Sequence, residues 1–240
     1  MKRLGAKFWK ITIICAVCAG LIGAAVWFFG FFLPQQKEQE ERAQWIQQYR
    51  QNKLELYRQE NERYDDYAVD VAFLGDSLTD GYDLAKYYPQ YVTANRGIGG
   101  DTTFDLEGRL QVSVYDLKPK VAVMLIGANN ADTMLQNYEA ILQGLKTNLP
   151  DTKIVLLSMT AMGGDIWGSK NQQAAYNNVS IRLLAEKYGF TFVDLFSPLY
   201  DVSTGEVYQG YTVDGGHFTD KGYTVITSII TPVLESLLEE

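Results

Sequence analysis

The hydrophobic pattern changes twice along the chain. Residues 11–33 form a run of 23 residues without a charged side chain, ended by Pro34. Residues 35–66 are dense in Gln, Glu, Arg and Lys and contain neither Gly nor Pro. From Ala68 onward, short apolar runs alternate with longer mixed stretches. The pattern therefore divides the chain into an apolar segment, a polar segment of good helix formers and an alternating domain.

The alternating part has the pattern of an α/β domain. Apolar runs of strand length lie at residues 69–74, 121–126, 154–158 and 190–195, with a weaker run at 91–94. Stretches typical of helices lie between and after them, at residues 102–113, 131–148, 171–188 and 219–238. Single strands separated by helices predict a parallel sheet that is covered on both faces. We expect one such domain over residues 67–240.

The apolar segment predicts a membrane anchor. As a helix, residues 11–33 would be roughly 35 Å long, enough to cross a hydrocarbon core of about 30 Å. Trp9 and the aromatic residues 27–32 lie toward its ends, where amphipathic rings prefer to sit. A cleaved secretory signal is the competing interpretation, and cleavage near Ala25 would leave a strongly apolar new terminus in water. An uncleaved transmembrane helix is favoured.

The charges flanking this segment predict its orientation. Residues 1–10 contain Lys2, Arg3, Lys7 and Lys10 and no acidic residue, which favours a basic cytoplasmic tail. The sequence thus predicts a single-pass protein of the cell membrane, with the domain on the extracellular side. Residues 34–66 would form a polar helical stalk. A coiled-coil seam is the alternative, but too few heptads are present to support it.

Composition excludes several classes of function. The net charge is −8, and the acidic body has no basic patch, which argues against nucleic-acid binding. The two cysteines, Cys15 and Cys18, both lie inside the apolar run, and the chain has one histidine. A metal site built on histidine or thiolate is therefore not expected.

One serine stands where open α/β sheets place their chemistry. The apolar run 69–74 stops at Gly75, and Ser77 follows two residues later. Ligands of such folds bind beyond the carboxyl ends of the strands. Taken alone, the stretch is equally well explained as a turn that leads into a helix, because Gly, Asp and Ser are common turn formers.

A base for this serine is present near the other end of the chain. Asp214 precedes His217 by three residues, with Gly215 and Gly216 between them. A tight turn there lets the carboxylate reach one ring nitrogen and leaves the other to face Ser77, as an activated serine requires. The competing interpretation is a surface histidine in a glycine-rich loop, with Thr219 capping the last helix.

Two further stretches offer hydrogen-bond donors for an oxyanion. The glycine-rich turn around Gly99 and Gly100 precedes a predicted helix, and such turns present backbone N–H groups to anions. Asn129 follows the strand predicted at 121–126, and its amide can donate to the same oxyanion. The alternative for this asparagine stretch is a cap of the next helix.

These stretches resemble, in family order, the sequence blocks of the SGNH or GDSL-type hydrolases. The blocks are Gly75-Asp76-Ser77-Leu78, the glycine of Gly99-Gly100-Asp101-Thr102, Asn129 in Gly-Ala-Asn-Asn, and Asp214-x-x-His217. They extend over residues 68–240, and the glycine and asparagine blocks are most similar to the branch of the platelet-activating-factor acetylhydrolase catalytic subunits. The resemblance implies a three-layer α/β/α sandwich with a parallel, flavodoxin-like sheet of five strands.

The resemblance also implies roles for individual residues. Ser77 would be the nucleophile, and His217 would act as general base and then acid, oriented by Asp214. The backbone N–H groups of Ser77 and Gly100 and the Asn129 amide would form the oxyanion hole. No metal and no cofactor is implied. Asn130 stands where the commoner family pattern has an aspartate, which leaves the role of that position open.

Together these features predict a membrane-anchored serine ester hydrolase that acts on an acyl ester of a lipid or an acetylated carbohydrate. An O-acyltransferase would share the first half-reaction and is the alternative. A non-catalytic surface-binding module is less favoured, because no catalytic position is degraded. The sequence predicts neither a particular acyl-chain length nor an oligomeric state.

Overall fold

The computed structural model describes residues 9, 12, 20–21, 23–24 and 26–239. The chain divides into two compact units, Met1–Asn52 and Lys53–Glu240. A short π-helix, η1 (Phe28–Phe32), precedes the long helix α2 (Leu33–Asn61), whose residues from Lys53 onward belong to the second unit. The Gln, Glu, Lys and Arg residues of this stretch have high helix propensity, which explains why it forms a helix.

The predicted membrane anchor is contradicted. Within 11–33, residues 11, 13–19, 22 and 25 lie outside the described residues. Among the residues that are described, no helix is both apolar and long enough to span a bilayer. Phe28–Phe32, directly before α2, form the π-helix η1, and α2 itself is polar and charged. The single-pass cell-membrane localisation with an extracellular domain, which rested on that anchor, is corrected with it.

The second unit is built on a parallel sheet of five strands, as the sequence predicted. The strands are β1 (Val71–Gly75), β2 (Thr93–Gly97), β3 (Val121–Leu125), β4 (Lys153–Leu157) and β5 (Thr191–Val193). Their order is β2-β1-β3-β4-β5, and all neighbouring pairs are parallel. In such a sheet the ligand crevice lies where the strand order reverses, outside the carboxyl ends of β1 and β3.

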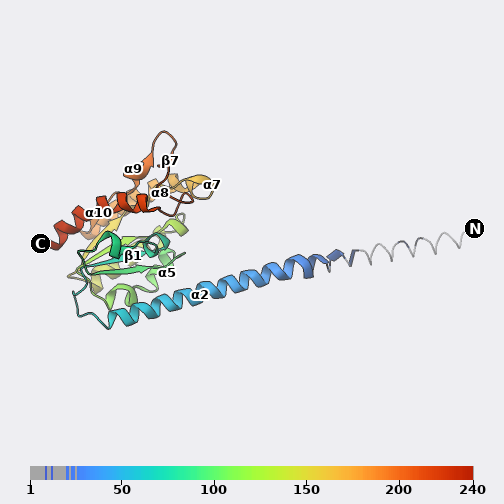
Figure 1. The fold of residues 1–240 in the computed structure, drawn as a ribbon, viewed down its shortest axis with the longest axis horizontal. Helices are drawn as coiled ribbons and strands as arrows, with labels where there is room; N and C mark the ends of the chain where they lie inside the picture. Colours follow the sequence, from blue (N-terminus) through green and yellow to red (C-terminus); the bar gives the residue numbers. More distant parts are fainter. Residues whose placement is uncertain (1–8, 10–11, 13–19, 22, 25, 240) are drawn as a thin grey trace, which may run out of the picture. The chain divides into compact units, whose positions relative to one another are not determined.

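Helices cover both faces of this sheet. Figure 1 shows α10, in red, along one face of the strands. The other elements are α3 (Ser77–Asp80), α4 (Leu84–Tyr87), α5 (Thr103–Glu107), η2 (Gln111–Tyr115), η3 (Ala128–Asn130), α6 (Leu135–Asn148), α7 (Gly164–Trp167), η4 (Gly168–Lys170), α8 (Asn171–Tyr188), α9 (Phe196–Leu199), α10 (Asp220–Glu239) and a two-stranded hairpin, β6 (Tyr200–Asp201) with β7 (Glu206–Val207).

Alternate strand residues enter two separate cores. Leu74, Met124 and Leu156 point into one core, where they pack with α5, α6 and α8. Phe73 and Val123, their neighbours in sequence, point into the other core, where they pack with α4 and α10. This alternation follows from the two-residue period of a strand. Helices, sheet and helices thus form three layers.

Two predicted elements differ in extent. The helix predicted over 102–113 is divided at Gly108, where α5 ends, and the chain continues into the π-helix η2. The strand predicted at 91–94 lies at Thr93–Gly97. Its boundary is displaced because Asn95 and Arg96 are polar, yet Arg96 is fully buried.

Candidate active site

Ser77 is the first residue of α3, directly beyond the carboxyl end of β1. Asp76 caps this helix, since its Oδ1 accepts a hydrogen bond from the Leu78 N–H at 3.0 Å. A Cβ atom at Gly75 would lie 2.3 Å from the carbonyl oxygen of Leu125. Glycine at this position therefore allows the sharp turn between strand and helix that presents the serine.

The turn from Asp214 to His217 orients the imidazole through several hydrogen bonds. The Asp214 carboxylate accepts from the backbone N–H groups of Gly216, at 2.9 Å, and of His217, at 2.8 Å. Its Oδ2 lies 2.7 Å from the His217 Nδ1. Partial burial acts to raise the pKa of Asp214, but these hydrogen bonds prevail and lower it to about 2. The carboxylate is therefore ionised over the whole neutral range.

The fold brings this turn to the serine. The other ring nitrogen of His217, Nε2, lies 3.0 Å from the Ser77 Oγ, across a sequence separation of 140 residues. Asp214, His217 and Ser77 thus form one hydrogen-bonded chain. This arrangement allows proton transfer from the hydroxyl to the imidazole.

The predicted oxyanion donors lie in adjoining loops. Gly100 adopts the left-handed φ of +82° between β2 and α5. Asn129 lines the same small cavity as Ser77 and His217, about 10 Å³ in volume. Its Nδ2 donates to the Asp101 carbonyl at 2.9 Å, which leaves the second hydrogen of this amide available for another acceptor. Among the described residues, the backbone N–H groups of Ser77 and Gly100 donate to no protein acceptor.

The position left open by the sequence, Asn130, has a structural role. Its amide donates to the Thr103 Oγ1 at 2.9 Å and accepts from the Thr103 N–H at 3.2 Å. It therefore joins the loop after β3 to the start of α5. An ionised aspartate cannot donate to the Thr103 hydroxyl, so that hydroxyl would have to be the donor. Its proton is already used, because the Thr103 Oγ1 donates to the Asn137 Oδ1 at 2.7 Å.

The comparison with known families decides the class of the protein. The sequence profile of the GDSL-like Lipase/Acylhydrolase family matches residues 73–225. The chain belongs to this family. It is a carboxylic ester hydrolase, as its relatives and neighbouring structures also indicate.

Similar proteins span most of this GDSL-like acylhydrolase. The human platelet-activating factor acetylhydrolase IB subunit alpha2 is 29% identical over 189 residues, covering 71% of this chain and 78% of the human protein. A Streptococcus pneumonia structure described as a platelet activating factor has a TM-score of 0.74 at 25% identity, covering 83% of this chain and 99% of the other. An acetyl xylan esterase, AlAXEase, has a TM-score of 0.57 at 25% identity, covering 69% and 99%.

The acylhydrolase site rests on a buried arginine that sequence reasoning missed. Arg109 Nε donates to the Asp101 Oδ2 at 2.6 Å, and its two other nitrogens donate to the carbonyls of Arg96 and Gly75, both at 2.9 Å. Gly75 precedes Asp76 and Ser77, and the Asp101 carbonyl holds Asn129. One guanidinium therefore fixes the ends of β1 and β2 and the asparagine loop together. Its signal in the sequence was a charged residue within the helix predicted over 102–113.

Trp167 forms a wall of the acylhydrolase site. Its ring lies edge-on to the His217 ring, with centroids 5.8 Å apart. Lys170 sits over the indole at 4.4 Å and donates to the Ala128 carbonyl at 3.0 Å. The cavity beside Ser77 is therefore closed on one side by an aromatic ring that is itself held in place.

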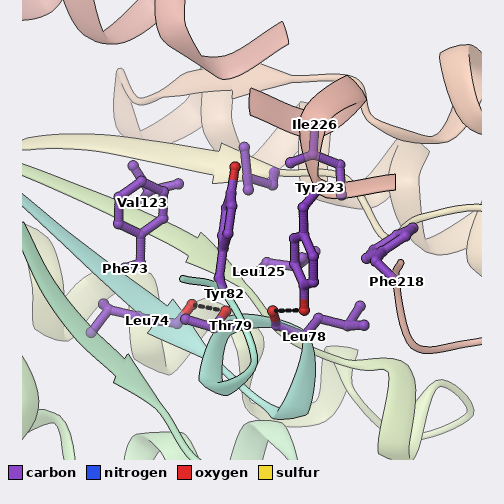
Figure 2. A pocket seen from close by; sticks show the side chains of 11 residues that line it. Phe73, Leu74, Leu78, Thr79, Tyr82, Val123, Leu125, Phe218, Tyr223 and Ile226 are labelled. Carbon is purple, nitrogen blue, oxygen red and sulfur yellow. Dashed lines mark hydrogen bonds between the residues drawn. The ribbon is translucent and has the colours of Figure 1, made fainter. Parts of the chain in front are cut away.

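A second apolar cavity lies beneath the nucleophile helix, between the sheet and α10 (Figure 2). The Tyr223 hydroxyl points from α10 to the Leu78 carbonyl and donates to it at 2.9 Å. The Tyr82 ring stacks on Tyr223 at 4.7 Å. These contacts stabilise α3, so the helix that bears Ser77 is anchored by α10 as well as by the sheet.

Proposed function

We propose that this protein hydrolyses short-chain carboxylic esters through an acyl-enzyme formed on Ser77. The observation that carries the proposal is the chain of contacts from Asp214 through His217 to Ser77, at 2.7 and 3.0 Å. The presence of Asn129 in the same cavity supports it. The similarity to an acetyl xylan esterase supports a short acyl group, such as acetyl, on either a lipid or a carbohydrate.

The reaction proceeds in two half-reactions. In the first, the Ser77 Oγ attacks the acyl carbon and its proton passes to the His217 Nε2. The oxyanion of the tetrahedral intermediate accepts hydrogen bonds from the backbone N–H groups of Ser77 and Gly100 and from the Asn129 amide. The intermediate collapses, and the leaving alcohol takes the proton from His217.

In the second half-reaction, water attacks the acyl-enzyme. His217 accepts a proton from this water and returns it to the Ser77 Oγ as the acid departs. Asp214 stays ionised, holds the ring in the required tautomer and stabilises the imidazolium that forms twice per cycle.

The test is hydrolysis of p-nitrophenyl acetate, butyrate and octanoate by the full chain. We expect the acetate to be preferred, Ser77→Ala to abolish turnover and labelling by a fluorophosphonate, and Asn129→Ala to lower kcat by roughly 10²–10³-fold. Ser228→Ala, a substitution on α10 whose hydroxyl bonds only within its helix, is the matched control. Equal rates for Ser77→Ala and the wild type would refute the proposal. So would a new ester, instead of free acid, as the main product when a sugar or lipid acceptor is present.

A further inference from the structure

The end of α2 packs against the loop that leads to Gly100. In α2, which the structure describes throughout, Tyr57 is the one buried side chain, at 1% exposure. Its hydroxyl donates to the Gly97 carbonyl at 2.6 Å, and its ring lies against the Arg96 guanidinium at 4.6 Å. The helix end thus holds the last carbonyl of β2.

Two further contacts connect the same helix end to this loop. Lys53 Nζ forms an ion pair with the Asp80 Oδ1 at 2.5 Å, and the Asp80 Oδ2 accepts from the Gly99 N–H at 3.0 Å. The fully buried Arg96 pairs with Glu60 and donates to the Asn61 Oδ1 at 3.0 Å. The Gly97 carbonyl is therefore bound by a residue of α2, and the Gly99 N–H by the Asp80 carboxylate that α2 pairs with.

The loop has no room to move on its opposite side. A Cβ atom at Gly97 would lie 2.1 Å from the Asp80 nitrogen of α3. The Asn95 side chain also ties the strand to α3, because its Nδ2 donates to the Thr79 carbonyl at 2.7 Å. The loop is thus clamped between α3, which bears the serine, and the end of α2. The next N–H after the fixed Gly99 belongs to Gly100, the expected oxyanion donor.

We propose that the turns Lys53–Asn61 of α2 position the Gly100 N–H for catalysis, with Tyr57 as the principal positioning residue. This inference rests on the ester hydrolysis proposed above. The helix end lies outside the residues 73–225 that the family profile matches. Oxyanion stabilisation depends steeply on geometry, and a displacement of about 1 Å is enough to slow an enzyme substantially.

The test compares two tyrosine-to-phenylalanine substitutions in the full chain. Tyr57→Phe removes the bond to Gly97 and keeps the ring beside Arg96. Tyr88→Phe is the matched control: Tyr88 is fully buried, and its hydroxyl lies 3.0 Å from that of Tyr82, away from the Gly97–Gly100 loop. The measurements are kcat and KM for p-nitrophenyl acetate, the rate of labelling by a fluorophosphonate, and the Tm.

We expect Tyr57→Phe to lower kcat and the labelling rate by about tenfold with KM nearly unchanged, because the donor acts on the transition state. Tyr88→Phe should lower the Tm without this change in kcat. Lys53→Gln, which breaks the ion pair at a partly exposed position, should lower kcat in the same way by a smaller factor.

Each outcome has a distinct meaning. A wild-type kcat for both Tyr57→Phe and Lys53→Gln, with wild type active and Ser77→Ala inactive, overturns the inference and leaves the proposed function standing. An equal fall in kcat for Tyr57→Phe and Tyr88→Phe also overturns it, since the effect would then follow stability alone. A wild-type protein that neither hydrolyses these esters nor is labelled refutes the proposed function, and the inference with it.

Discussion

Asp76, in the turn before the nucleophile, is a buried carboxyl that destabilises the fold when it is ionised. Its carboxyl is 1% exposed, and burial raises its pKa to about 6, with the nearby Asp101 acting in the same direction. The hydrogen bond from the Leu78 N–H lowers the pKa, and so do the nearby His217 and Arg109. Together they do not cancel the rise that burial causes. The native state therefore binds a proton more tightly than the unfolded chain does, and ionisation at neutral pH costs stability.

We expect Asp76→Asn to raise the free energy of unfolding at neutral pH. Between about pH 4 and pH 6 the native carboxyl holds a proton that the unfolded chain has lost, so the wild type loses stability as pH rises through this window. A shift from 3.8 to about 6 corresponds to roughly 3 kcal/mol, and asparagine still caps α3. Urea unfolding of both proteins at pH 4, 5, 6 and 7 measures the difference. A gain that is constant across this range, or largest at pH 4, would contradict the assignment.

At the level of elements, the Asp214–His217 turn depends on its fit against the loop before α7. The Gly163 N–H donates to the Gly215 carbonyl at 2.8 Å. Gly215 has a φ of +90°, and a Cβ there would lie 1.8 Å from the Gly163 carbonyl oxygen. At Gly216 a Cβ would lie 2.7 Å from the Trp167 ring. The two glycines therefore let the turn and the tryptophan wall approach each other.

Gly215→Ala should lower kcat by about 10²-fold, because the displaced turn carries both Asp214 and His217. The matched control is Gly210→Ala, which has a similar φ of +83° and open space around its Cβ. This control should lose about 1–2 kcal/mol of stability from the left-handed backbone and keep its kcat. Steady-state kinetics and thermal unfolding of both variants separate the two effects. If Gly215→Ala and Gly210→Ala have similar kcat values, the close contact of position 215 with the loop before α7 does not control turnover.

The strands could be predicted from sequence wherever the buried residues form an unbroken apolar run. The strands β1, β3 and β4 are continuous apolar runs, and their predicted limits agree with the structure to within two residues. The polar strand β2 was displaced, since Arg96 is buried by partners from α2 that no local pattern reveals. On the polar stretch 34–66, predicted as a solvated stalk, nothing in the local pattern singled out Tyr57, the side chain of α2 that is buried.

At the level of the whole molecule, the sheet order explains why the loops that carry Ser77 and Asn129 meet. From β1 the chain adds β2 on one side and β3 on the other, and the loops that follow β1 and β3 open on the crevice formed between these two strands. Motif order in the sequence was enough to propose Ser77, His217 and Asn129 as neighbours. The membrane anchor, predicted from the hydropathy of residues 11–33, was wrong: among the residues that the structure describes, no helix is long and apolar enough to span a bilayer.

The extent of the compact unit leads to a prediction about shortened chains. The domain limit predicted at residue 67 follows a change in composition. In the structure, the compact unit that contains the sheet begins at Lys53. A chain of residues 67–240 would lack Tyr57 and the partners of Arg96, whereas residues 53–240 would keep them. Loss of the buried tyrosine alone should lower the free energy of unfolding by about 2–3 kcal/mol.

Urea unfolding of these two chains, followed by tryptophan fluorescence, measures this difference. The comparison is clean because both chains retain the whole sheet and Trp167, and they differ only in residues 53–66. A Tyr57→Ala substitution in the longer chain should reproduce most of the loss, since the same buried ring is removed while the backbone of α2 remains. Equal unfolding midpoints for the two chains would mean that the end of α2 contributes nothing to the stability of the acylhydrolase unit. A large loss on shortening with no loss for Tyr57→Ala would instead assign the stability to the ion pairs of Lys53 and Glu60.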